Sequence, residues 1–460
     1  MNFGLRKYFI WLGSVMAIAC LYVTAMNLNL GLQAENVSVF DQRLDSPSRI
    51  YLKQIRAIDG MQKCTPLIMG AQNRVAIYYV YCTQSELRRF GSPAKITENF
   101  DVPEDLARRF HFWRSVYSYW GSDQYLVHLS EYPEVVLEML DSSRLSDEMS
   151  DLEKYDYVKN VYKIQKKAYR RLLRQMHKYR NTPEKFTPAM VRVASYMAHI
   201  EDKNKYREAA RGIRIQRGQR DFIKSGLHTA SKYLGHIEQN FVDNDVPVEL
   251  ALIAFVESSF NLLARSKVGA SGVYQIMPST GKQYLKVGNG IDERNDPIKA
   301  SLAAAKLFAL NYKILNSWPL AVTAYNHGVG GIKRGVRRSG SGDLSEIIQS
   351  YNGRAFGFAS KNFYTSFLGV LATIRDRDEI FTDVEIQELI KFRTYKLRNN
   401  TSVSYFKKKF NLSDADIKEL NPDLALWYIR TNGVLPRGYV LKLPVSEELS
   451  LYRASGNKAE

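Results

Sequence analysis

The sequence has few of the side chains from which metal centres are built. Its 460 residues include only three cysteines and seven histidines. The histidines are scattered, without the paired spacing or the neighbouring cysteines that metal ligands usually show. No glycine-rich phosphate loop or dinucleotide fingerprint follows a predicted strand. We therefore expect this protein to hold no metal and no cofactor.

Acidic residues are also in short supply. The chain has 47 Asp and Glu against 65 Lys and Arg, which gives a formal net charge of +18. In a cytoplasmic protein this excess would suggest a nucleic-acid partner. However, Arg6 and Lys7 are followed by 19 uncharged residues, 8–26, which is the pattern of an export signal. We therefore expect an anionic wall or membrane surface, and no nucleic acid, as the partner.

Residues 1–34 are predicted to be a signal peptide or a membrane anchor. The apolar segment 8–26 is long for a cleaved signal and just long enough to span a membrane, so cleavage and anchoring both stay open. Cys20 faintly resembles a lipoprotein site, but apolar residues continue after it, which favours a plain apolar cysteine. The protein is expected in the periplasm or cell envelope.

Helical periodicity dominates the rest of the chain and predicts a mainly α protein. Residues 154–180 hold ten Lys or Arg and one Asp, with apolar residues at helical spacing, which indicates an amphipathic helix with a basic outer face. The segment opening with Glu131 and Pro133 is also expected to begin a helix. Further helices are expected at 106–119, 187–207, 211–241, 297–310 and 318–327.

Glu257 is the most unusual residue of the chain. It is the only charged side chain between residues 250 and 264, in a segment that is apolar nearly all round and so predicts a buried helix. A poorly solvated carboxyl favours its neutral, proton-donating form. From this segment alone, a catalytic acid and a core glutamate paired with Arg or Lys stay open.

Three further motifs follow Glu257-Ser258: Gly-Ala-Ser-Gly-Val-Tyr-Gln-Ile-Met-Pro-Ser-Thr at 269–280, Ala-Tyr-Asn-His-Gly at 324–328 and Phe-Tyr-Thr at 363–365. In this order they resemble the catalytic domain of lytic transglycosylases, goose-type-lysozyme-like enzymes of bacterial cell-wall turnover. The resemblance covers residues 215 to 378. It implies a lysozyme-like transglycosylase fold and non-hydrolytic cleavage of the MurNAc-β-1,4-GlcNAc bond of peptidoglycan, which leaves 1,6-anhydro-MurNAc ends.

The resemblance also implies roles for individual residues. Glu257 would protonate the leaving oxygen and, as a carboxylate, then take the proton of the muramic acid C6 hydroxyl. Tyr364 would hydrogen-bond Glu257 or the substrate. The implied substrate-binding residues are Ser258, Gly272, Val273, Tyr274, Gln275, Ile276, Tyr325, Asn326 and Tyr364. For Ser258 a helix-capping role stays open, and for Gln275 a buried amide that satisfies backbone groups.

Two other functions stay open beside the transglycosylase. One is a muramidase that uses water, and the other is a non-catalytic scaffold that binds peptidoglycan. Most glycosidases use two carboxyl groups, and no second acid occurs in these motifs. The single acid favours the transglycosylase.

The end of the chain resembles another family. Residues 388–445 resemble a LysM module, a strand-helix-helix-strand fold that binds glycans containing N-acetylglucosamine. Asn399-Asn400-Thr401 stands where the pattern has Gly-Asp-Thr, and residues 424–434 form an insertion. Glycan binding and a purely structural role both stay open. The predicted organisation is thus 1–34 signal or anchor, 35–214 mostly helical domain, 215–387 catalytic domain, 388–445 LysM-like module and 446–460 tail.

Cys64 and Cys82 are the two cysteines outside the export segment. Residues 74–81 between them are rich in β-formers and predict a hairpin that an oxidising compartment could clasp with a disulfide. We expect the disulfide; the alternative is two unpaired thiols. Thiol titration of the exported protein under denaturant should find this pair unreactive until a reductant is added. Two reactive thiols before reduction would contradict the pairing.

Overall fold

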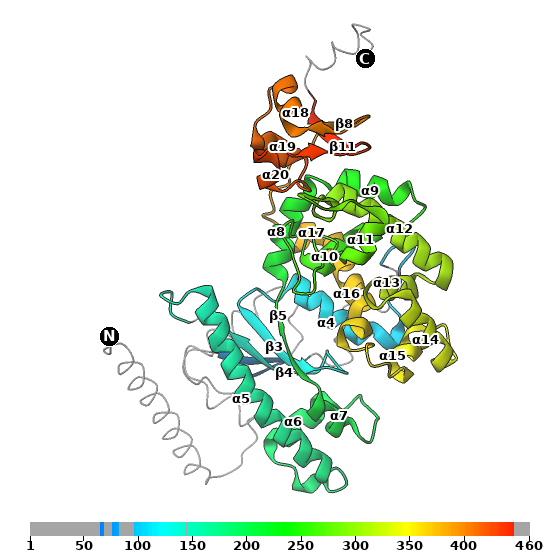
Figure 1. The fold of residues 1–460 in the computed structure, drawn as a ribbon. Coiled ribbons are helices and arrows are strands. Elements are labelled where there is room, and N and C mark those ends of the chain that lie inside the picture. Colours follow the sequence, from blue (N-terminus) through cyan, green and yellow to red (C-terminus); the bar gives the residue numbers. More distant parts are fainter. Residues whose placement is uncertain (1–64, 69–75, 82–95, 144, 446–460) are drawn as a thin grey trace, which may run out of the picture. The chain divides into compact units, whose positions relative to one another are not determined.

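The computed structural model describes residues 65–68, 76–81, 96–143 and 145–445, and helices are the main elements of these ranges (Figure 1). The mainly α class is therefore confirmed. The predicted signal or anchor, the tail 446–460, Cys64 and Cys82 lie outside the described residues. No helix in the described ranges is long and apolar enough to cross a membrane.

The N-terminal part is built on an antiparallel sheet of five strands in the order β1-β2-β4-β3-β5. Its strands are β1 (Thr65–Ile68), β2 (Ala76–Tyr81), β3 (Gln124–Leu129), β4 (Val136–Asp141) and β5 (Ile213–Arg217). The predicted hairpin is present as β1 paired with β2, with Thr65 opposite Tyr81. In the sequence, the two cysteines come immediately before β1 and immediately after β2.

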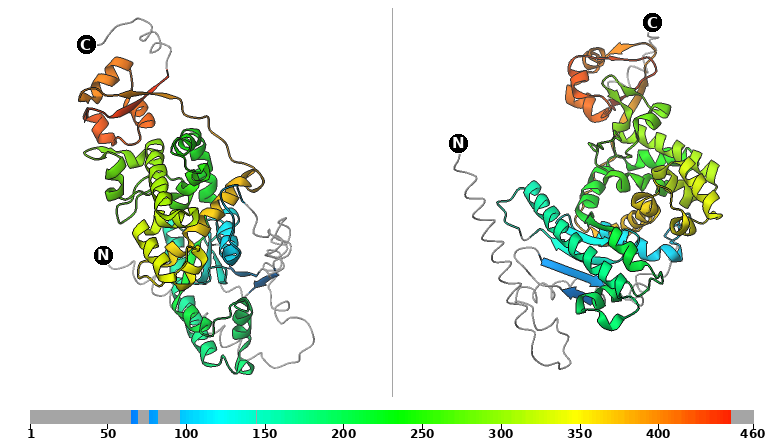
Figure 2. Two further views of the ribbon diagram at one scale, coloured as in Figure 1. Left: turned by 90° about the vertical axis from the view of Figure 1, so that its right-hand side faces the viewer. Right: turned by 60° about the horizontal axis from the view of Figure 1, so that its bottom comes forward.

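Both faces of β3 are covered. Val127 and Leu129 pack in one core with α5 (Asp151–Lys178), α6 (Pro188–Tyr196) and α7 (Lys205–Arg211). On the other face His128 lies 4.9 Å from the ring of Phe112 and 5.5 Å from that of Phe358. Figures 1 and 2 show α5 lying along the sheet. The sheet is therefore a middle layer between two sets of helices.

The sheet corrects two of the predictions. The segment after Pro133 forms β4 instead of a helix, and the range 211–241 begins with the strand β5. Five of the six residues of β4 are buried, so its apolar residues do not alternate as in a half-exposed strand. Such a run cannot be told from a buried helix by its periodicity. The predicted mostly helical N-terminal part is, in its described residues, a sheet with helices.

The basic amphipathic helix is confirmed as α5. Ser150 caps its first turn, and Glu153 completes a capping box by accepting from the Ser150 backbone. Val158, Tyr169, Leu173 and Met176 are its buried residues and face the sheet. The lysines and arginines between them lie on the solvent side.

A group of helices follows the sheet. It consists of α8 (Arg220–Ser231), α9 (Leu234–Val242), α10 (Ile253–Ser258), α11 (Pro278–Tyr284), α12 (Pro297–Leu315), α13 (Trp318–His327), α14 (Val329–Ser339), α15 (Leu344–Ser350), α16 (Phe358–Arg375) and α17 (Arg377–Ile380), with the small hairpin β6 (Val287–Gly288) and β7 (Ile291–Asp292). The helices predicted at 297–310 and 318–327 are confirmed as α12 and α13.

Helix α16 is buried along almost its whole length. The earlier helix α4 (Ala107–Ser118) packs against it. The two backbones meet at Gly369, where an added Cβ would lie 2.8 Å from the Arg114 nitrogen. Helix α4 therefore belongs to the packing of the later helices, although it precedes the predicted domain boundary at 214/215.

The C-terminal module, residues 392–444, packs around a core that includes Leu397, Phe406 and Leu441, together with Ile291 of β7. Strands β8 (Phe392–Lys396) and β11 (Val440–Pro444) pair antiparallel. Between them lie β9 (Thr401–Ser402), α18 (Val403–Phe410), α19 (Asp414–Leu420), α20 (Leu426–Arg430) and β10 (Val434–Leu435). Helix α20 lies in the segment 424–434 that the sequence marks as an insertion.

A buried ion pair joins this module to α12. Lys442 Nζ lies 2.6 Å from Asp296 Oδ2, and the two side chains are 5% and 0% exposed. Asp296 also caps α12 by accepting from the backbone of Ile298 and Lys299. Asp292 and Asp296 are therefore turn and cap residues, since Asp292 Oδ1 accepts from the Arg294 nitrogen.

We predict that Lys442→Met lowers the free energy of unfolding by about 3–5 kcal/mol, because Asp296 would remain buried without its counter-charge. The matched control is Lys224→Met. Lys224 also lies 2.6 Å from a carboxylate, that of Asp383, but these side chains are 34% and 70% exposed. Its loss should change stability by less than about 1 kcal/mol in the same denaturant titration. Equal effects of the two variants would contradict the prediction.

Candidate active site

Glu257 lies in the last turn of α10. The segment begins as the 3-10 turn η3 (Val248–Leu252) and continues as α10, in which Ile253, Ala254 and Phe255 are buried. The predicted buried helix is therefore present, with a first turn wound more tightly than expected. Glu257 comes one residue before the helix ends.

The carboxyl group of Glu257 is poorly solvated. The residue is half-buried, so part of its surface borders a pocket while protein surrounds the rest. Burial raises its pKa from 4.5 to about 8. In the described part of the chain, no Lys or Arg forms an ion pair with it. The described residues therefore do not fit the alternative of a core glutamate paired with Arg or Lys.

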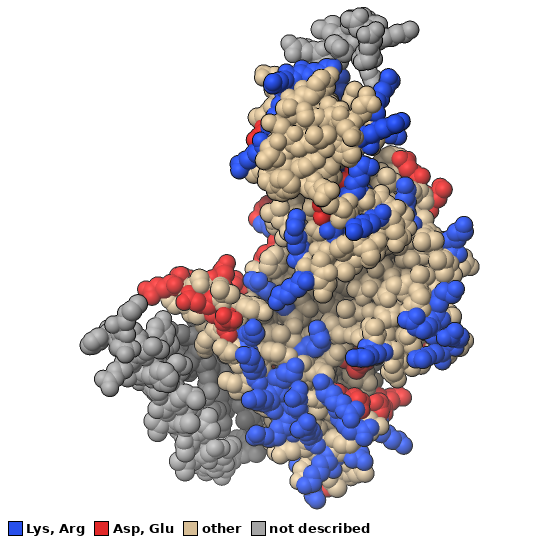
Figure 3. All heavy atoms as spheres, in the orientation of Figure 1, with Lys and Arg blue, Asp and Glu red and all other residues tan. Residues whose placement is uncertain are grey.

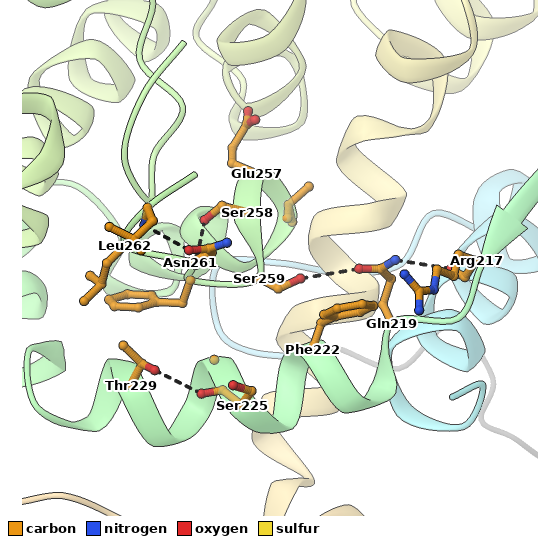
Figure 4. A pocket seen from close by; sticks show the side chains of 14 residues that line it. Arg217, Gln219, Phe222, Ser225, Thr229, Glu257, Ser258, Ser259, Asn261 and Leu262 are labelled. Atoms are coloured by element: carbon orange, nitrogen blue, oxygen red, sulfur yellow. Dashed lines mark hydrogen bonds between the residues drawn. The ribbon is translucent and has the colours of Figure 1, made fainter. Parts of the chain in front are cut away.

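Two pockets meet at Glu257, one of about 720 Å³ and one of about 350 Å³. Both are lined by Gln219, Val256, Glu257 and Ser259. Among the residues that line them, Glu257 is the only acid. Figure 4 shows the larger pocket, with Ser225 and Thr229 of α8 on one side and Glu257 directed away from them. The carboxyl is therefore not directed into the part of the larger pocket that α8 lines, while the smaller pocket joins Glu257 with Tyr117 and Asn326.

Ser258 fastens the end of α10. Its Oγ donates to the carbonyls of Ala254 (3.1 Å) and Val273 (2.9 Å) and accepts from the Asn261 nitrogen (3.2 Å). The next residue, Ser259, has a left-handed backbone with φ of 51°. Ser258 borders the larger pocket, so it combines the capping role left open by the sequence with a position in the site.

The segment 272–276 is mostly buried. Gly272 has φ of +74°, and an added Cβ would lie 1.8 Å from the Arg294 carbonyl oxygen, so only glycine fits there. Val273, Tyr274 and Ile276 are each less than 5% exposed. These side chains support the site from within the core.

The polar side chains of this segment bond to backbone. The Gln275 amide donates to the carbonyls of Ala264 (3.1 Å) and Gly272 (2.8 Å), which is the alternative that the sequence left open. Tyr274 Oη donates to the Ala251 carbonyl at 3.0 Å. The segment thus brings the Val273 carbonyl to Ser258 of α10 and the Tyr274 carbonyl to Tyr325 of α13.

Tyr325 and Asn326 lie beside this segment at the end of α13. Tyr325 Oη donates to the Tyr274 carbonyl at 2.8 Å, and its ring stacks on Phe308 at 4.8 Å. Burial, and then the nearby Glu257 carboxylate, raise the pKa of Tyr325. Asn326 is exposed and borders the smaller pocket, where its Oδ1 accepts from Ser360 at 3.0 Å. The structure therefore brings both residues close to Glu257.

Among the described residues, Tyr364 does not form the expected hydrogen bond to Glu257, while its other expected partner, the substrate, stays a prediction. Its Oη donates to the Asp101 carbonyl at 3.3 Å, not to Glu257. Besides Tyr325, a tyrosine whose pKa is affected by Glu257 is Tyr117 of α4. Burial raises its pKa, the nearby Glu257 carboxylate raises it further, and its Oη hydrogen-bonds Ser366 Oγ at 2.5 Å.

Several residues of the two pockets were missed by sequence reasoning. Trp113 and Tyr117 come from α4, and Arg214, Gln216 and Arg217 come from β5. The aromatic composition of 106–119 was the only signal for the first two. The residues of β5 gave no signal, because that segment was expected to be helical.

A metal centre has no counterpart among these residues. Within the described ranges, no group of three His, Cys, Asp or Glu side chains is close enough to hold a metal ion. The chemistry that this site offers from its own residues is proton transfer by Glu257 beside hydroxyl and amide groups.

Comparison with known proteins agrees with this geometry. Residues 236–348 match the family described as Transglycosylase SLT domain. Two membrane-bound lytic murein transglycosylases D, from Escherichia coli K12 and from E. coli O6:H1, are each 36% identical over 120 residues, which cover 25% of this chain and 26% of theirs. The chain thus matches about a quarter of the length of these relatives.

Among solved structures, the 70 kDa soluble lytic transglycosylase from E. coli is 19% identical, with 44% of this chain and 30% of that chain covered and a TM-score of 0.25. The family match includes Glu257, the segment 272–276 and Tyr325-Asn326. It confirms the lysozyme-like transglycosylase fold expected for this part. Residues 236–348 of the chain are a transglycosylase SLT domain.

Proposed function

We propose that this protein is a peptidoglycan lytic transglycosylase, which cleaves the MurNAc-β-1,4-GlcNAc bond without water and leaves 1,6-anhydro-MurNAc ends. The observation that carries the proposal is the single carboxyl group of Glu257, half-buried where two pockets meet inside an SLT domain. Relatives named as lytic murein transglycosylases support the choice of substrate.

In the first step Glu257 acts as a general acid. With a pKa raised to about 8, its carboxyl carries a proton at neutral pH and can donate it to the glycosidic oxygen. Departure of the protonated oxygen leaves positive charge at C1 of the muramic acid ring. The N-acetyl group of the substrate stabilises that charge.

In the second step the Glu257 carboxylate acts as a base. It accepts the proton of the C6 hydroxyl while the C6 oxygen forms its bond to C1, which closes the anhydro ring and returns Glu257 to the acid form. The step consumes no water. The hydroxyls of Tyr117 and Tyr325 stay protonated because burial raises their pKa values, so they do not compete as bases.

A muramidase that uses water is the nearest alternative. An inverting enzyme needs a second carboxylate about 6.5–9.5 Å from the acid, and a retaining one a carboxylate at about 5–5.5 Å. The residues that line the two pockets offer no second acid. A non-catalytic scaffold would have no reason to keep an unpaired carboxyl half-buried, since desolvation makes it costly.

We further propose that residues 388–445 form a LysM-like module and that the protein works in the cell envelope. The paired strands β8 and β11 with α18 and α19 between them support the module. The charge pattern of the first 34 residues supports export, with peptidoglycan glycan strands as the partner. Residues 8–26 would serve as the anchor if they are retained.

Glu257→Gln should lower the release of soluble fragments from purified murein at least about 100-fold, because both proton transfers are lost. Binding to murein should remain, since the amide is nearly isosteric with the protonated acid. Mass spectrometry of the wild-type products should find anhydro ends.

The matched control is Glu249→Gln, the same substitution eight residues earlier, where the side chain is partly exposed and accepts from Asn99. It should retain wild-type turnover. Unchanged turnover in Glu257→Gln would remove Glu257 from its role. Reducing-end muramic acid without anhydro products would defeat the transglycosylase assignment in favour of the muramidase.

We also expect kcat/KM to fall about tenfold per pH unit above pH 8, because the proton donor is lost there. The free energy of unfolding should depend on pH below pH 8, where kcat/KM does not yet fall. Between pH 4.5 and 8 the folded protein holds a proton on Glu257 that the unfolded chain has lost, so rising pH destabilises the fold.

As pH rises, the unfolding free energy of the wild type should therefore fall relative to that of Glu257→Gln, by at most about 1.4 kcal/mol per pH unit. The difference should level off above pH 8. Denaturant titrations at pH 5, 6, 7, 8 and 9 measure this difference. A difference that does not vary with pH would place the pKa of Glu257 at its ordinary value.

A further inference from the structure

The smaller pocket contains a cation that the SLT domain does not supply. Arg214 lies on β5, outside the matched range 236–348, and borders the same 350 Å³ pocket as Glu257. Strand β5 is held in place by β3, with Arg214 opposite His128 in the register. Figure 3 shows Lys and Arg gathered over the face that carries α5, α6, α7 and β5.

The guanidinium of Arg214 is positioned but not neutralised. It lies over the ring of Phe358, 4.2 Å from the centroid, and the residue is exposed. In the described ranges it has no carboxylate partner. By contrast Arg211, three residues earlier, pairs with Glu208 at 2.9 Å. Arg214 thus differs from Arg211 in having no carboxylate partner among the described residues.

The surroundings of Arg214 favour an anion. Glu257 is the only acid that lines the pocket, and it is neutral at pH 7 because burial raises its pKa to about 8. His128, which packs against the same Phe358 ring, adds no charge of its own, since burial lowers its pKa to about 3. Among the described residues that line this pocket, Arg214 is thus the only one that carries a charge at pH 7.

We propose that Arg214 is a specificity-determining residue, which binds a free carboxylate of the peptide stem on the sugar that occupies the smaller pocket. This inference rests on the proposed function, because it assigns a group of the murein substrate to the site of Glu257.

The chemistry of Arg214 selects a carboxylate over a sugar hydroxyl. A planar guanidinium binds a carboxylate through two parallel hydrogen bonds, and its position on an aromatic ring reduces the freedom lost on binding. A pocket of 350 Å³ is at the lower end for ligand sites, so a peptide stem must extend beyond it, and Arg214 is the exposed cation among the lining residues. A strand stripped of stems offers a second carboxylate, that of the muramic acid itself.

The test compares three murein substrates: strands with free stems, strands whose stem carboxylates have been converted to amides, and strands stripped of stems. In wild type, kcat/KM should be highest for free stems. In Arg214→Gln, the ratio of kcat/KM for free stems to that for amidated stems should fall about tenfold, the usual effect of losing a charged hydrogen bond. Arg214→Lys should lie between the two, because it keeps the charge without the planar fork.

Arg211→Gln is the matched control, since it removes the same charge from a residue that borders neither pocket, and it should leave the ratio unchanged. A ratio in Arg214→Gln within twofold of wild type would overturn the proposal. So would a fall in kcat/KM that is equal for all three substrates. An effect confined to stripped strands would assign Arg214 to the muramic acid carboxylate and overturn the stem assignment.

Binding separates this proposal from the proposed function. In a Glu257→Gln background, adding Arg214→Gln should weaken the Kd for a disaccharide with a free stem about tenfold, and should do so for no amidated form. This result would stand even if wild type released no anhydro products from any substrate, an outcome that would defeat the proposed function alone.

Discussion

The site depends on how the last turn of α10 is held. A helix of six residues is too short to be stable by itself, so the position of Glu257 is set by contacts at the end of the helix. Ser258 Oγ bonds to the Val273 carbonyl on one side. On the other side α8 approaches so closely at Gly226 that an added Cβ would lie 2.2 Å from the Ser259 carbonyl oxygen. These contacts fix Glu257 at a position that borders both pockets.

This constraint explains why most residues of the second motif are buried. The loop must offer two carbonyls, that of Val273 to Ser258 and that of Tyr274 to Tyr325. Gln275, with φ of 45°, keeps the loop in shape by donating to two other carbonyls. Polar side chains that a motif presents as ligands for sugar can therefore serve the backbone, and the dry surroundings they create keep a proton on Glu257.

The sequence predicts what depends on local order. The amphipathic α5 and the buried turn around Glu257 both follow from neighbouring residues. Strand β4 escapes prediction because five of its six residues are buried, which removes the alternation that marks a strand. Strand β5 lies at the sheet edge and keeps an Ile-Arg-Ile alternation, but it is only five residues long and lies between two helices in the sequence. The sequence also does not predict that Tyr117 and Arg214 lie near Glu257. Only the packing of α4 on α16 and the pairing of β5 with β3 bring these two residues to it.

Among the contacts between the C-terminal module and the helices, one short segment also reaches the site. Arg294 donates to the carbonyls of Gly269 and Ile276, which flank the buried loop, and pairs with Asp292 at 2.8 Å. The Asp292 nitrogen in turn donates to the Asp423 carbonyl of the module at 2.8 Å. Moving the module away would break these bonds and would leave Asp296 without its ion-pair partner Lys442. The module is therefore docked on the segment that holds the loop 272–276 in place, and is not tethered to it by a free linker.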